Sequence, residues 1–324
     1  MLEQNLPKDQ VTLENLRRMA GPRMKWVYFN TESPKHMSSI PAFRHFLFNV
    51  TMSYSHESDV VAPYWYAREV KRLGDEGAST QDATKKGTID YQKRREGSFV
   101  LGNEKVNNGW PSHEGLSERT DVVDEGRGRG HGRNMRGQRR IWINKTKEVG
   151  WVVSHCVAER KHVAERLSEM IPGVEIFGSC VGRRLSGRVA DLIKDYKFYL
   201  AFENSFCPDY VTEKYWNVLG KAIPIVMGST TTRTLIPNSY IRVEDFPTLE
   251  ALAAHVRRVS ADEYLYDSYF DWMDRFEVPR EWGEEHWSCR LCRYLFRTRG
   301  QMKVSDLGSF YAKDQCVVPD IVKH

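Results

Sequence analysis

Long apolar runs are missing from this sequence. No stretch reaches the roughly 18 consecutive apolar residues of a membrane-spanning helix. The N-terminal segment MLEQNLPKDQVTLENLRR lacks the apolar core of a signal peptide. The chain as written is therefore expected to be soluble.

A strong excess of one charge is also missing. The net charge is +5 over 324 residues, which is too small to require nucleic acid as a partner but suits a small acidic ligand such as a nucleotide. Hydrophobic residues make up 40% and aromatic residues 12% of the chain, a composition typical of globular proteins. The length is sufficient for two domains of ordinary size.

Residues 67–140 are poor in apolar side chains and rich in Gly, Arg, Lys, Glu and Asp. Within them, DEGRGRGHGRNMRGQRR is of low complexity. Such a composition does not bury enough apolar surface to offset the entropy of ordering, so we interpret most of this stretch as a disordered, solvated insertion. The alternative is an Arg/Gly-rich arm that binds RNA, but the basic run lacks the repeated aromatic residues of such arms.

A second metal-binding pair of cysteines or histidines is missing from the sequence. One CxxC pair is present and no further Cys or His pair follows it, so no zinc site is expected. An even number of cysteines allows either disulfides or free thiols. The six cysteines are Cys156, Cys180, Cys207, Cys289, Cys292 and Cys316. Glycosylation sequons at Asn49 and Asn144 agree with a secretory lumen.

Strand-like and helix-like segments alternate in the second half of the chain. The predicted strands are 149–156, 173–180, 197–204, 223–228 and 240–246, with an earlier strand at 24–31. The predicted helices are 157–171, 188–196, 209–222 and 248–261. This alternation predicts βαβ units, a parallel sheet and a nucleotide-binding type of α/β domain.

The segment FENSFCPDYVTEK, residues 202–214, combines two acids, a lysine, an asparagine and a tyrosine at the end of a predicted strand. Ligands of parallel sheets bind at the carboxyl ends of strands, where backbone N–H groups of a following helix favour phosphate. Lys214 adds a full positive charge there. The alternative is that Glu213 and Lys214 form a surface pair in a first helical turn.

The longer block FYLAFENSFCPDYVTEKYWNVLGKAIPIVMG resembles the signature of the α1,3-fucosyltransferases, glycosyltransferase family 10. The blocks WVYFNTESPKH, FNVTMSYSHESDVVAPY, YIRVEDF, YFDW and a terminal CxxC agree in order. The resemblance covers residues 24–66 and about 142–295. It implies transfer of L-fucose from GDP-fucose, with inversion, to the 3-hydroxyl of a GlcNAc residue on an N-glycan core or a Lewis-type antenna.

The resemblance also implies a fold. Family members have the GT-B architecture, an α/β fold in which two Rossmann-like domains face a cleft. On this basis residues 1–66 are a partial acceptor-side domain, 67–140 an insertion, 141–295 the GDP-fucose-binding domain and 296–324 a C-terminal tail. The N-terminal domain is expected to be incomplete, because the family-like part begins within it.

The family's catalytic groups are matched by three residues. Glu32, in TESPKH, matches the proposed base, and such a reaction needs a carboxylate on the acceptor hydroxyl. Arg160 and Lys214 match the diphosphate contacts, where cations stabilise the leaving group. Without the family, Glu32 is an acid in a loop and Arg160 a solvated helix arginine.

Further donor-binding residues follow from the same resemblance. Positions that match contacts to the donor are Ser154, Asn204, Tyr210 and Glu213. His155 also matches a donor-binding position, where asparagine is common in relatives, and it can donate a hydrogen bond there. Glu203 either contacts the donor or braces the backbone of the turn. Tyr215 and Trp216 are expected in the core.

Family members are lumenal Golgi membrane proteins with an oxidised terminal CxxC. The resemblance therefore implies a disulfide between Cys289 and Cys292, with Cys156–Cys180 as another pair. No cofactor is required, and a divalent ion such as Mn²⁺ only stimulates relatives. The expected partners are GDP-fucose and a GlcNAc-containing glycoprotein acceptor, without nucleic acid, and a membrane anchor is expected in the full-length protein.

The chain departs from the family in two places. By comparison with the family, the anchor and the first strands of the N-terminal sheet are expected to be missing, and the insertion at 67–140 to be far longer than the link in relatives. A gene-model error would produce both features. The alternative function is therefore a catalytically inactive, truncated protein that binds GDP-fucose or nothing.

Overall fold

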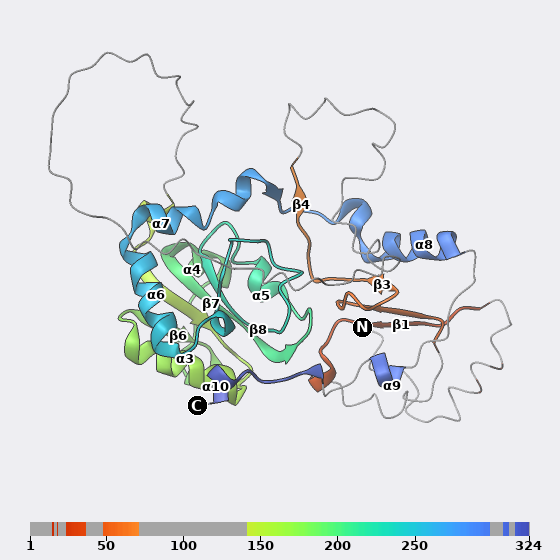
Figure 1. The fold of residues 1–324 in the computed structure, drawn as a ribbon, viewed down its shortest axis with the longest axis horizontal. Coiled ribbons are helices and arrows are strands. Elements are labelled where there is room, and N and C mark those ends of the chain that lie inside the picture. The colour runs from red at the N-terminus through yellow and green to blue at the C-terminus, as the bar shows by residue number, and fades with distance from the viewer. Residues whose placement is uncertain are drawn as a thin grey trace, which may run out of the picture. The chain divides into compact units, whose positions relative to one another are not determined.

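The structure is a computed structural model that describes residues 15, 18, 24–36, 48–70, 141–298, 307–310 and 315–323 (Figure 1). Apart from residues 67–70, the predicted insertion at 67–140 lies outside the described residues. None of the described helices combines the length and the apolar character that a membrane crossing requires.

Five parallel strands form the larger sheet, in the order β6-β5-β7-β8-β9. They are β5 (Lys147–Val152), β6 (Val174–Phe177), β7 (Tyr196–Cys207), β8 (Ile223–Ser229) and β9 (Ile241–Arg242). The central strand β7 is almost wholly buried, as expected for a parallel strand covered on both faces. The predicted α/β fold is confirmed for this part of the chain.

Helices cover both faces of this sheet. Side chains alternate along β7, so Phe198, Leu200 and Phe202 join the core formed with α3 (Ala158–Met170) and α6 (Leu249–Ala261). Tyr199 and Ala201 point to the opposite face, where α4 (Val189–Asp195) and α5 (Glu213–Trp216) pack. Figure 1 shows α3 and α6 on one side of the sheet and α5 on the other. The same alternation puts Glu203 on the α5 face.

The helix predicted at 209–222 is wrong in extent. Only α5 is helical, and a turn over residues 217–221 follows it, in which Gly220 has a φ of +73°. Asp209 has a φ of +61°, which is incompatible with a helix beginning there. Thr212 caps α5, because its side chain accepts from the backbone N–H of Lys214. The motif is therefore an ordered loop between β7 and one helical turn.

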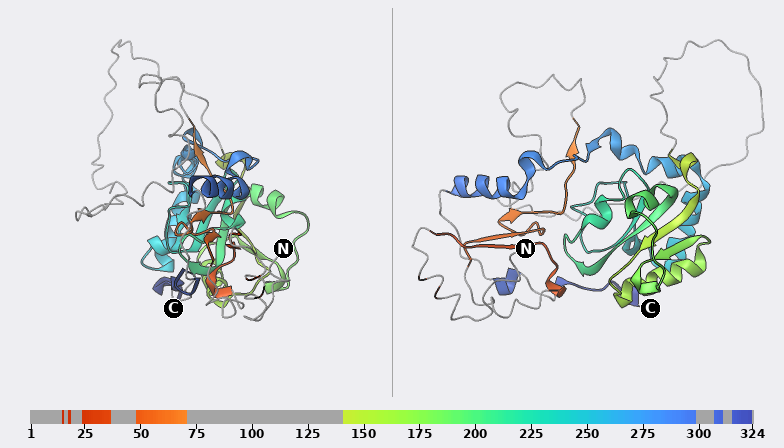
Figure 2. Two further views of the ribbon diagram at one scale, coloured as in Figure 1. Left: turned by 90° about the vertical axis from the view of Figure 1, so that its right-hand side faces the viewer. Right: turned by 180° about the vertical axis from the view of Figure 1, so that it is seen from behind.

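A second parallel sheet lies in the N-terminal part. Its strands are β1 (Val27–Asn30), β2 (Val50–Ser53) and β3 (Val60–Val61), in the order β1-β2-β3. Apolar residues of β2 and β3 pack against Leu291, Tyr294 and Leu295 of α8 (Trp287–Thr298). Figure 2 shows α8 beside this sheet in a view from behind. The expectation of two parallel α/β parts is confirmed, with three strands described in the first.

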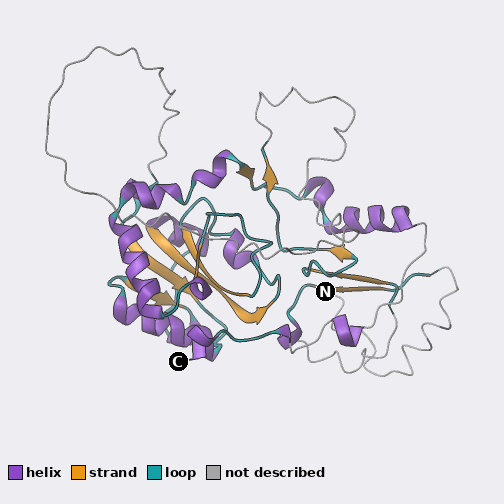
Figure 3. Cartoon of the chain, in the orientation of Figure 1, coloured by secondary structure: helices purple, strands orange, loops and turns teal. Residues whose placement is uncertain are grey.

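The remaining elements lie outside the two parallel sheets. β4 (Arg68–Glu69) pairs antiparallel with β10 (Phe276–Glu277), so the first residues of the predicted insertion form a strand (Figure 3). α7 (Glu263–Ser268) contacts α6. After α8, α9 (Leu307–Phe310) adds Leu307 to a cluster around Tyr210, and α10 (Asp320–Lys323) packs against α3.

Candidate functional site

Glu203, near the carboxyl end of β7, is the buried acid of the site and is 4% exposed. Its Oε1 accepts hydrogen bonds from the Thr212 backbone N–H at 2.7 Å and from Thr212 Oγ1 at 2.9 Å. Burial raises the pKa of Glu203, against the opposing effect of the Lys214 ammonium and the Thr212 bonds. Of the two alternatives left by the sequence, these contacts favour a brace for the turn.

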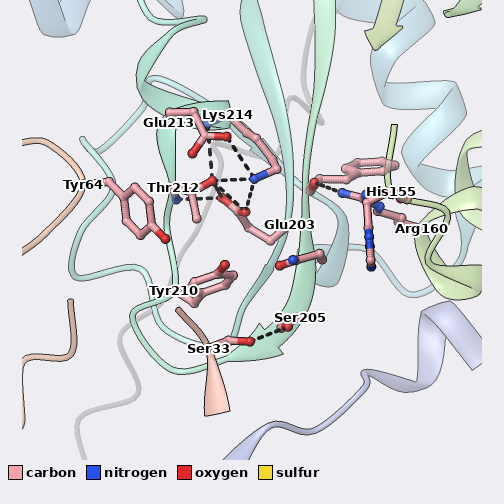
Figure 4. A network of polar contacts seen from close by, with 12 residues as sticks. Ser33, Tyr64, His155, Arg160, Glu203, Ser205, Tyr210, Thr212, Glu213 and Lys214 are labelled. Carbon is pink, nitrogen blue, oxygen red and sulfur yellow. Dashed lines mark hydrogen bonds and ion pairs between the residues drawn. The ribbon is translucent and has the colours of Figure 1, made fainter. Parts of the chain in front are cut away.

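The ammonium group of Lys214 lies among three oxygen atoms (Figure 4). Nζ is 2.8 Å from Thr212 Oγ1, 3.2 Å from Glu203 Oε2 and 3.2 Å from Glu213 Oε1. Burial alone would lower the pKa of Lys214, but the carboxylates of Glu203 and Glu213 outweigh it and raise the pKa. The lysine is therefore charged at neutral pH, and its side chain is 30% exposed. Such a cation is available to an incoming anion.

Glu32 lies in the loop after β1 and reaches the motif that follows β7. The Tyr210 hydroxyl donates to Glu32 Oε1 at 2.6 Å, across 178 residues of sequence. The same oxygen accepts the backbone N–H of Ser33 at 3.0 Å. Two residues that the sequence assigned separately, to acceptor and donor chemistry, are thus in direct contact.

The loop after β1 is fixed to β7 by two further hydrogen bonds. Ser33 Oγ and Ser205 Oγ are 2.7 Å apart, and both side chains are completely buried (Figure 4). His36 Nε2 lies 3.2 Å from the Asn204 carbonyl oxygen. These contacts bring the Glu32 loop against the strand that carries Glu203.

Arg160, in the first turn of α3, is buried, with 4% of its surface exposed. Its guanidinium donates to the carbonyl oxygen of Phe202 at 3.2 Å and to that of His155. Its Nε is buried without a hydrogen-bond partner, and no ion pair of Arg160 is found among the described residues. Burial lowers the pKa of Arg160. The alternative of a solvated helix arginine is therefore wrong, and a buried cation that forms no ion pair with a described residue favours an anionic ligand.

The other predicted donor residues lie around these groups. Ser154 and His155 are exposed in the loop between β5 and α3, and the His155 ring is 5.7 Å from the His36 ring. Asn204 is half-buried, and its Oδ1 is buried without a hydrogen-bond partner among the described residues. Glu213 is exposed beside Lys214. The structure thus places the predicted site residues at the carboxyl ends of β1, β5 and β7 and in the first turns of the helices that follow β5 and β7.

Two elements of the site escaped the sequence analysis. Tyr64 donates from its hydroxyl to the Thr31 carbonyl at 2.8 Å, and burial, with Glu32 as a further cause, raises its pKa to about 12. Asp209 is buried and accepts from the His56 backbone N–H at 3.0 Å and from Arg233 Nη2 at 2.9 Å. A positive φ at a non-glycine residue gives no clear sequence signal, although aspartate tolerates it better than most residues.

The structure confirms one predicted disulfide and contradicts the other. Cys156–Cys180 is a disulfide, as predicted, and fixes the loop that carries Ser154 and His155. Cys207–Cys316 is a second disulfide that the sequence did not identify. The predicted Cys289–Cys292 bond is wrong, because both are free and exposed on α8. Residues three apart on a helix have Cβ atoms about 5–6 Å apart, whereas a disulfide needs about 3.5–4.5 Å.

The predicted sequons differ in their surroundings. Asn144 is exposed at the end of a short 3-10 helix, Trp142–Asn144. Asn49 is half-buried, and its Oδ1 accepts from the Trp26 backbone N–H at 2.9 Å. Glycosylation at either site stays a prediction, and Asn144 is the more accessible.

Two family profiles match the chain. The profile described as "Fucosyltransferase, N-terminal" matches residues 4–65, and "Glycosyltransferase family 10 (fucosyltransferase) C-term" matches residues 142–310. The chain therefore belongs to glycosyltransferase family 10, the fucosyltransferases. The N-terminal match begins earlier than the sequence blocks quoted above.

Individual relatives agree with this family. The chain is 37% identical over 171 residues to alpha-(1,3)-fucosyltransferase fut-6 of Caenorhabditis elegans, covering 48% of this chain and 43% of that protein. It is 41% identical over 165 residues to glycoprotein 3-alpha-L-fucosyltransferase A of Drosophila melanogaster, covering 47% and 32%. The chain thus spans less than half the length of these relatives.

A longer alignment covers most of the chain. It is 28% identical over 309 residues to the bovine 4-galactosyl-N-acetylglucosaminide 3-alpha-L-fucosyltransferase 9, covering 92% of this chain and 67% of that protein. A solved structure of an alpha1,3-fucosyltransferase with GDP-fucose aligns with a TM-score of 0.41 and 21% identity, over 49% of this chain and 48% of that chain.

Proposed function

We propose that this chain is an inverting α1,3-fucosyltransferase of the GT-B type, which moves L-fucose from GDP-fucose to the 3-hydroxyl of a GlcNAc residue on a glycoprotein glycan. Membership of the family supports this activity. The observation that carries the proposal is the contact between Glu32 and Tyr210. It joins the matched base to the matched donor motif, two parts that are far apart in the sequence.

The reaction requires a base on the acceptor and positive charge on the donor. In the proposed step Glu32 accepts the proton of the GlcNAc 3-hydroxyl while that oxygen forms a bond to C1 of fucose. The bond between C1 and the diphosphate oxygen breaks, and its electron pair leaves with GDP. The transition state resembles an oxocarbenium ion, so the departing diphosphate carries the growing negative charge.

Lys214 and Arg160 supply the opposing charge. Lys214 is a charged side chain at a partly exposed position, and a diphosphate oxygen would replace one of its carboxylate contacts. Arg160 retains a buried Nε–H without a partner among the described residues, beside the loop that carries Ser154. A guanidinium fixed by two carbonyl groups loses little entropy when it binds an anion.

For the acceptor we propose the sugar residue, GlcNAc, without choosing between an N-glycan core and an antenna. The names of the relatives include a glycoprotein fucosyltransferase and an enzyme of 4-galactosyl-N-acetylglucosaminide. Both are compatible with a GlcNAc residue, which supports GlcNAc on an N-glycan core or on an antenna. Activity on matched core-type and antenna-type glycans would distinguish the two.

Replacement of Glu32 by glutamine tests the function. The general base typically contributes on the order of 10²–10⁴ in rate, and glutamine keeps the size of the side chain but cannot accept the proton. Glu32→Gln should therefore lose most fucose transfer to a GlcNAc-containing acceptor while binding GDP-fucose as tightly as the wild type. Glu165→Gln, an exposed acid on α3 whose ion-pair partner Lys161 lies outside the site, is the matched control.

The outcomes separate an enzyme from a binding protein. Near-normal transfer in Glu32→Gln would exclude Glu32 as the base. GDP-fucose binding by the wild type without any transfer would instead identify a catalytically inactive member of the family. A joint loss of binding and transfer in Glu32→Gln would indicate a structural role for the loop.

We also propose Golgi membranes as the location and a reaction that requires no metal cofactor. The family relationship supports both proposals. The metal-free reaction is further supported by Lys214 and Arg160, whose positive charges are available to the diphosphate. Transfer should persist in excess EDTA and rise at most modestly with Mn²⁺. Complete loss of transfer in EDTA, restored by Mn²⁺, would contradict the metal-independent mechanism.

A further inference from the structure

Asp209 lies where loops that follow three strands come together. It follows β7, Thr231 and Arg233 follow β8, and His56 lies in the loop between β2 and β3 of the N-terminal sheet. The side chain of Asp209 is completely buried and contacts residues of the other two loops. Ligands of parallel sheets bind at the carboxyl ends of the strands. Asp209 therefore joins the two sheets at their ligand-binding edges.

Both carboxylate oxygens of Asp209 are occupied. Oδ1 accepts hydrogen bonds from Thr231 Oγ1 and from Arg233 Nε at 3.2 Å. Oδ2 accepts from Arg233 Nη2 at 2.9 Å and from the His56 backbone N–H at 3.0 Å. The guanidinium of Arg233 thus grips both oxygens at once, a geometry that an ammonium group does not reproduce.

These contacts hold a main-chain conformation that few residues other than glycine adopt. The φ of Asp209 is +61°, and its backbone N–H donates to Thr231 Oγ1 at 3.1 Å. The next residue is Tyr210, which matches a donor-binding position and whose hydroxyl donates to Glu32 at 2.6 Å. Because the two residues are adjacent, a change in the main chain at Asp209 redirects the side chain of Tyr210.

We propose that Asp209 and Arg233 are positioning residues of the donor site, whose ion pair holds Tyr210 in the orientation that contacts GDP-fucose. The inference rests on the proposed function and deepens its donor site. Arg233 also reaches the N-terminal sheet, because its Nη1 lies 3.5 Å from Glu57 Oε1 in the loop between β2 and β3. The ion pair therefore sets the loop after β7 against the sheet whose first strand leads to Glu32.

The burial of the two partners separates a positioning role from a ligand contact. Asp209 is enclosed and both of its oxygens are engaged, so its carboxylate is not available to a ligand. The side chain of Arg233 is 48% exposed, so its replacement leaves the core intact. Loss of Arg233 frees the carboxylate on one side, while the bonds from Thr231 and the His56 N–H persist.

Arg233→Ala tests the proposal. The Kd of GDP-fucose, measured by calorimetry, should rise about 5- to 50-fold, because residues of one ion-pair network are coupled by energies of that size. The KM for GDP-fucose should rise in parallel. The kcat at saturating GDP-fucose should fall by less than about threefold, since the loss is one of donor binding. A purely structural role would lower the melting temperature and leave the Kd unchanged.

Arg233→Lys separates geometry from charge. Lysine keeps the positive charge but not the two-pronged grip, so only part of the affinity should return. Arg166→Ala is the matched control. Arg166 lies on α3 with a side chain that is 42% exposed, and it pairs with Glu250 at 3.3 Å. It removes the same charge and a comparable ion pair, so its Kd and KM for GDP-fucose should match the wild type.

A double variant with Tyr210→Phe shows whether Arg233 acts through the tyrosine. Tyr210→Phe removes the hydroxyl and should weaken GDP-fucose binding by itself. In that background Arg233→Ala should raise the Kd by less than about threefold, because the contact that it positions is already absent. Additive losses would overturn the proposal and assign Arg233 to a direct contact with the donor.

The remaining outcomes also decide the proposal. Weaker GDP-fucose binding in Arg233→Ala, restored only in part by Arg233→Lys and not additive with Tyr210→Phe, supports it. An unchanged Kd in Arg233→Ala overturns it while the proposed function stands, as does full recovery in Arg233→Lys, which would leave only an effect of charge. A wild type that neither binds nor transfers fucose from GDP-fucose overturns the proposed function itself, and the positioning role with it.

Discussion

Lys214 Nζ and Glu203 Oε2 form a 3.2 Å ion pair whose lysine side chain is 30% exposed and whose glutamate side chain is 4% exposed. The pair is asymmetric, because the carboxylate is desolvated and the ammonium faces partly outward. Loss of the lysine leaves a buried acid, whereas binding of an anion needs only a shift of the lysine. The same residue therefore contributes both to stability and to the proposed donor site.

Lys214→Ala is predicted to reduce both properties. The free energy of unfolding should fall by about 1–3 kcal/mol, because Glu203 loses its ion partner while it remains buried. GDP affinity should fall strongly, because a phosphate-contacting cation is removed. Urea unfolding and calorimetry with GDP measure the two effects.

Lys161→Ala provides the control for this prediction. Lys161 pairs with Glu165 on the exposed face of α3, with side-chain exposures of 43% and 51%, so its loss should change stability by less than about 0.5 kcal/mol. Unchanged GDP affinity in Lys214→Ala would show that Lys214 does not contact the diphosphate. Unchanged stability would show that Thr212 alone satisfies Glu203.

Asp209 gives a prediction for acid stability. Burial alone would raise its pKa, but hydrogen bonds from His56 and Thr231 outweigh it and depress the pKa below the ordinary value. An acid whose pKa is lowered in the folded state stabilises that state at pH values above its unfolded-state pKa of about 3.9. This stabilisation is lost as the pH falls through the folded-state pKa. Stability should therefore decline below about pH 4 because of Asp209.

Asp209→Asn is the variant that isolates this effect. Asparagine also tolerates the positive φ of 61°, so the main chain is not strained by the change. The variant should be less stable than the wild type at pH 7 by about 1–3 kcal/mol and should approach the wild type at acidic pH. Chemical unfolding between pH 3 and pH 7 measures the difference, and a difference independent of pH would contradict the assignment.

The sequence predicted the site where its signals were local. Lys214 and Glu213 sit in one contiguous motif, and the larger sheet follows from alternating strands and helices. The contact between Glu32 and Tyr210 spans 178 residues and depends on how two sheets meet, which no spacing reveals. Only the resemblance placed both residues in one site.

Other failures have different physical causes. The helix predicted over 209–222 has suitable apolar residues, but Asp209 adopts a positive φ because three partners hold its carboxylate. Tertiary contacts thus override helix propensity there. The terminal CxxC has the spacing of a disulfide or metal pair, yet a continuous helix runs through it. Cys207 and Cys316 carry no spacing signal at all.

The two disulfides should differ in their contribution to stability. Cys207–Cys316 closes a separation of 109 residues and Cys156–Cys180 one of 24 residues. The chain-entropy relation gives about 5 kcal/mol for the longer loop and about 3.4 kcal/mol for the shorter. Paired Cys→Ser variants should follow this order in urea unfolding. An equal loss would show that native-state contacts, rather than loop closure, dominate.

The free thiols of α8 should react without unfolding. Cys289 and Cys292 are exposed and unbonded, so a thiol reagent should label two equivalents per chain under native conditions. Mass spectrometry of the labelled peptides locates them. A peptide in which both residues resist labelling until a reductant is added would restore the disulfide that the resemblance implied.

Gly228, near the end of β8, lies in close contact with β7, the strand that carries Glu203. Its φ is +129°, and a Cβ there would lie 2.6 Å from Glu203 Cβ and 2.9 Å from the Ser205 carbonyl oxygen. Neither neighbour is the end of a flexible side chain, so β7 and β8 would have to separate locally. Gly228→Ala should therefore lower the free energy of unfolding by at least about 2 kcal/mol, combining strain with overpacking.

Gly182→Ala separates these two causes. Gly182 also has a positive φ, +67°, but nothing lies within 4 Å of its added Cβ, so the expected loss is the conformational cost of about 1–2 kcal/mol. The excess loss in Gly228→Ala measures the contact with Glu203 and Ser205. Because Ser205 is bonded to Ser33, beside Glu32, we expect Gly228→Ala to lower transfer as well as stability, and Gly182→Ala to leave transfer unchanged. Equal stability losses, or normal transfer in Gly228→Ala, would show that the strand tolerates the shift.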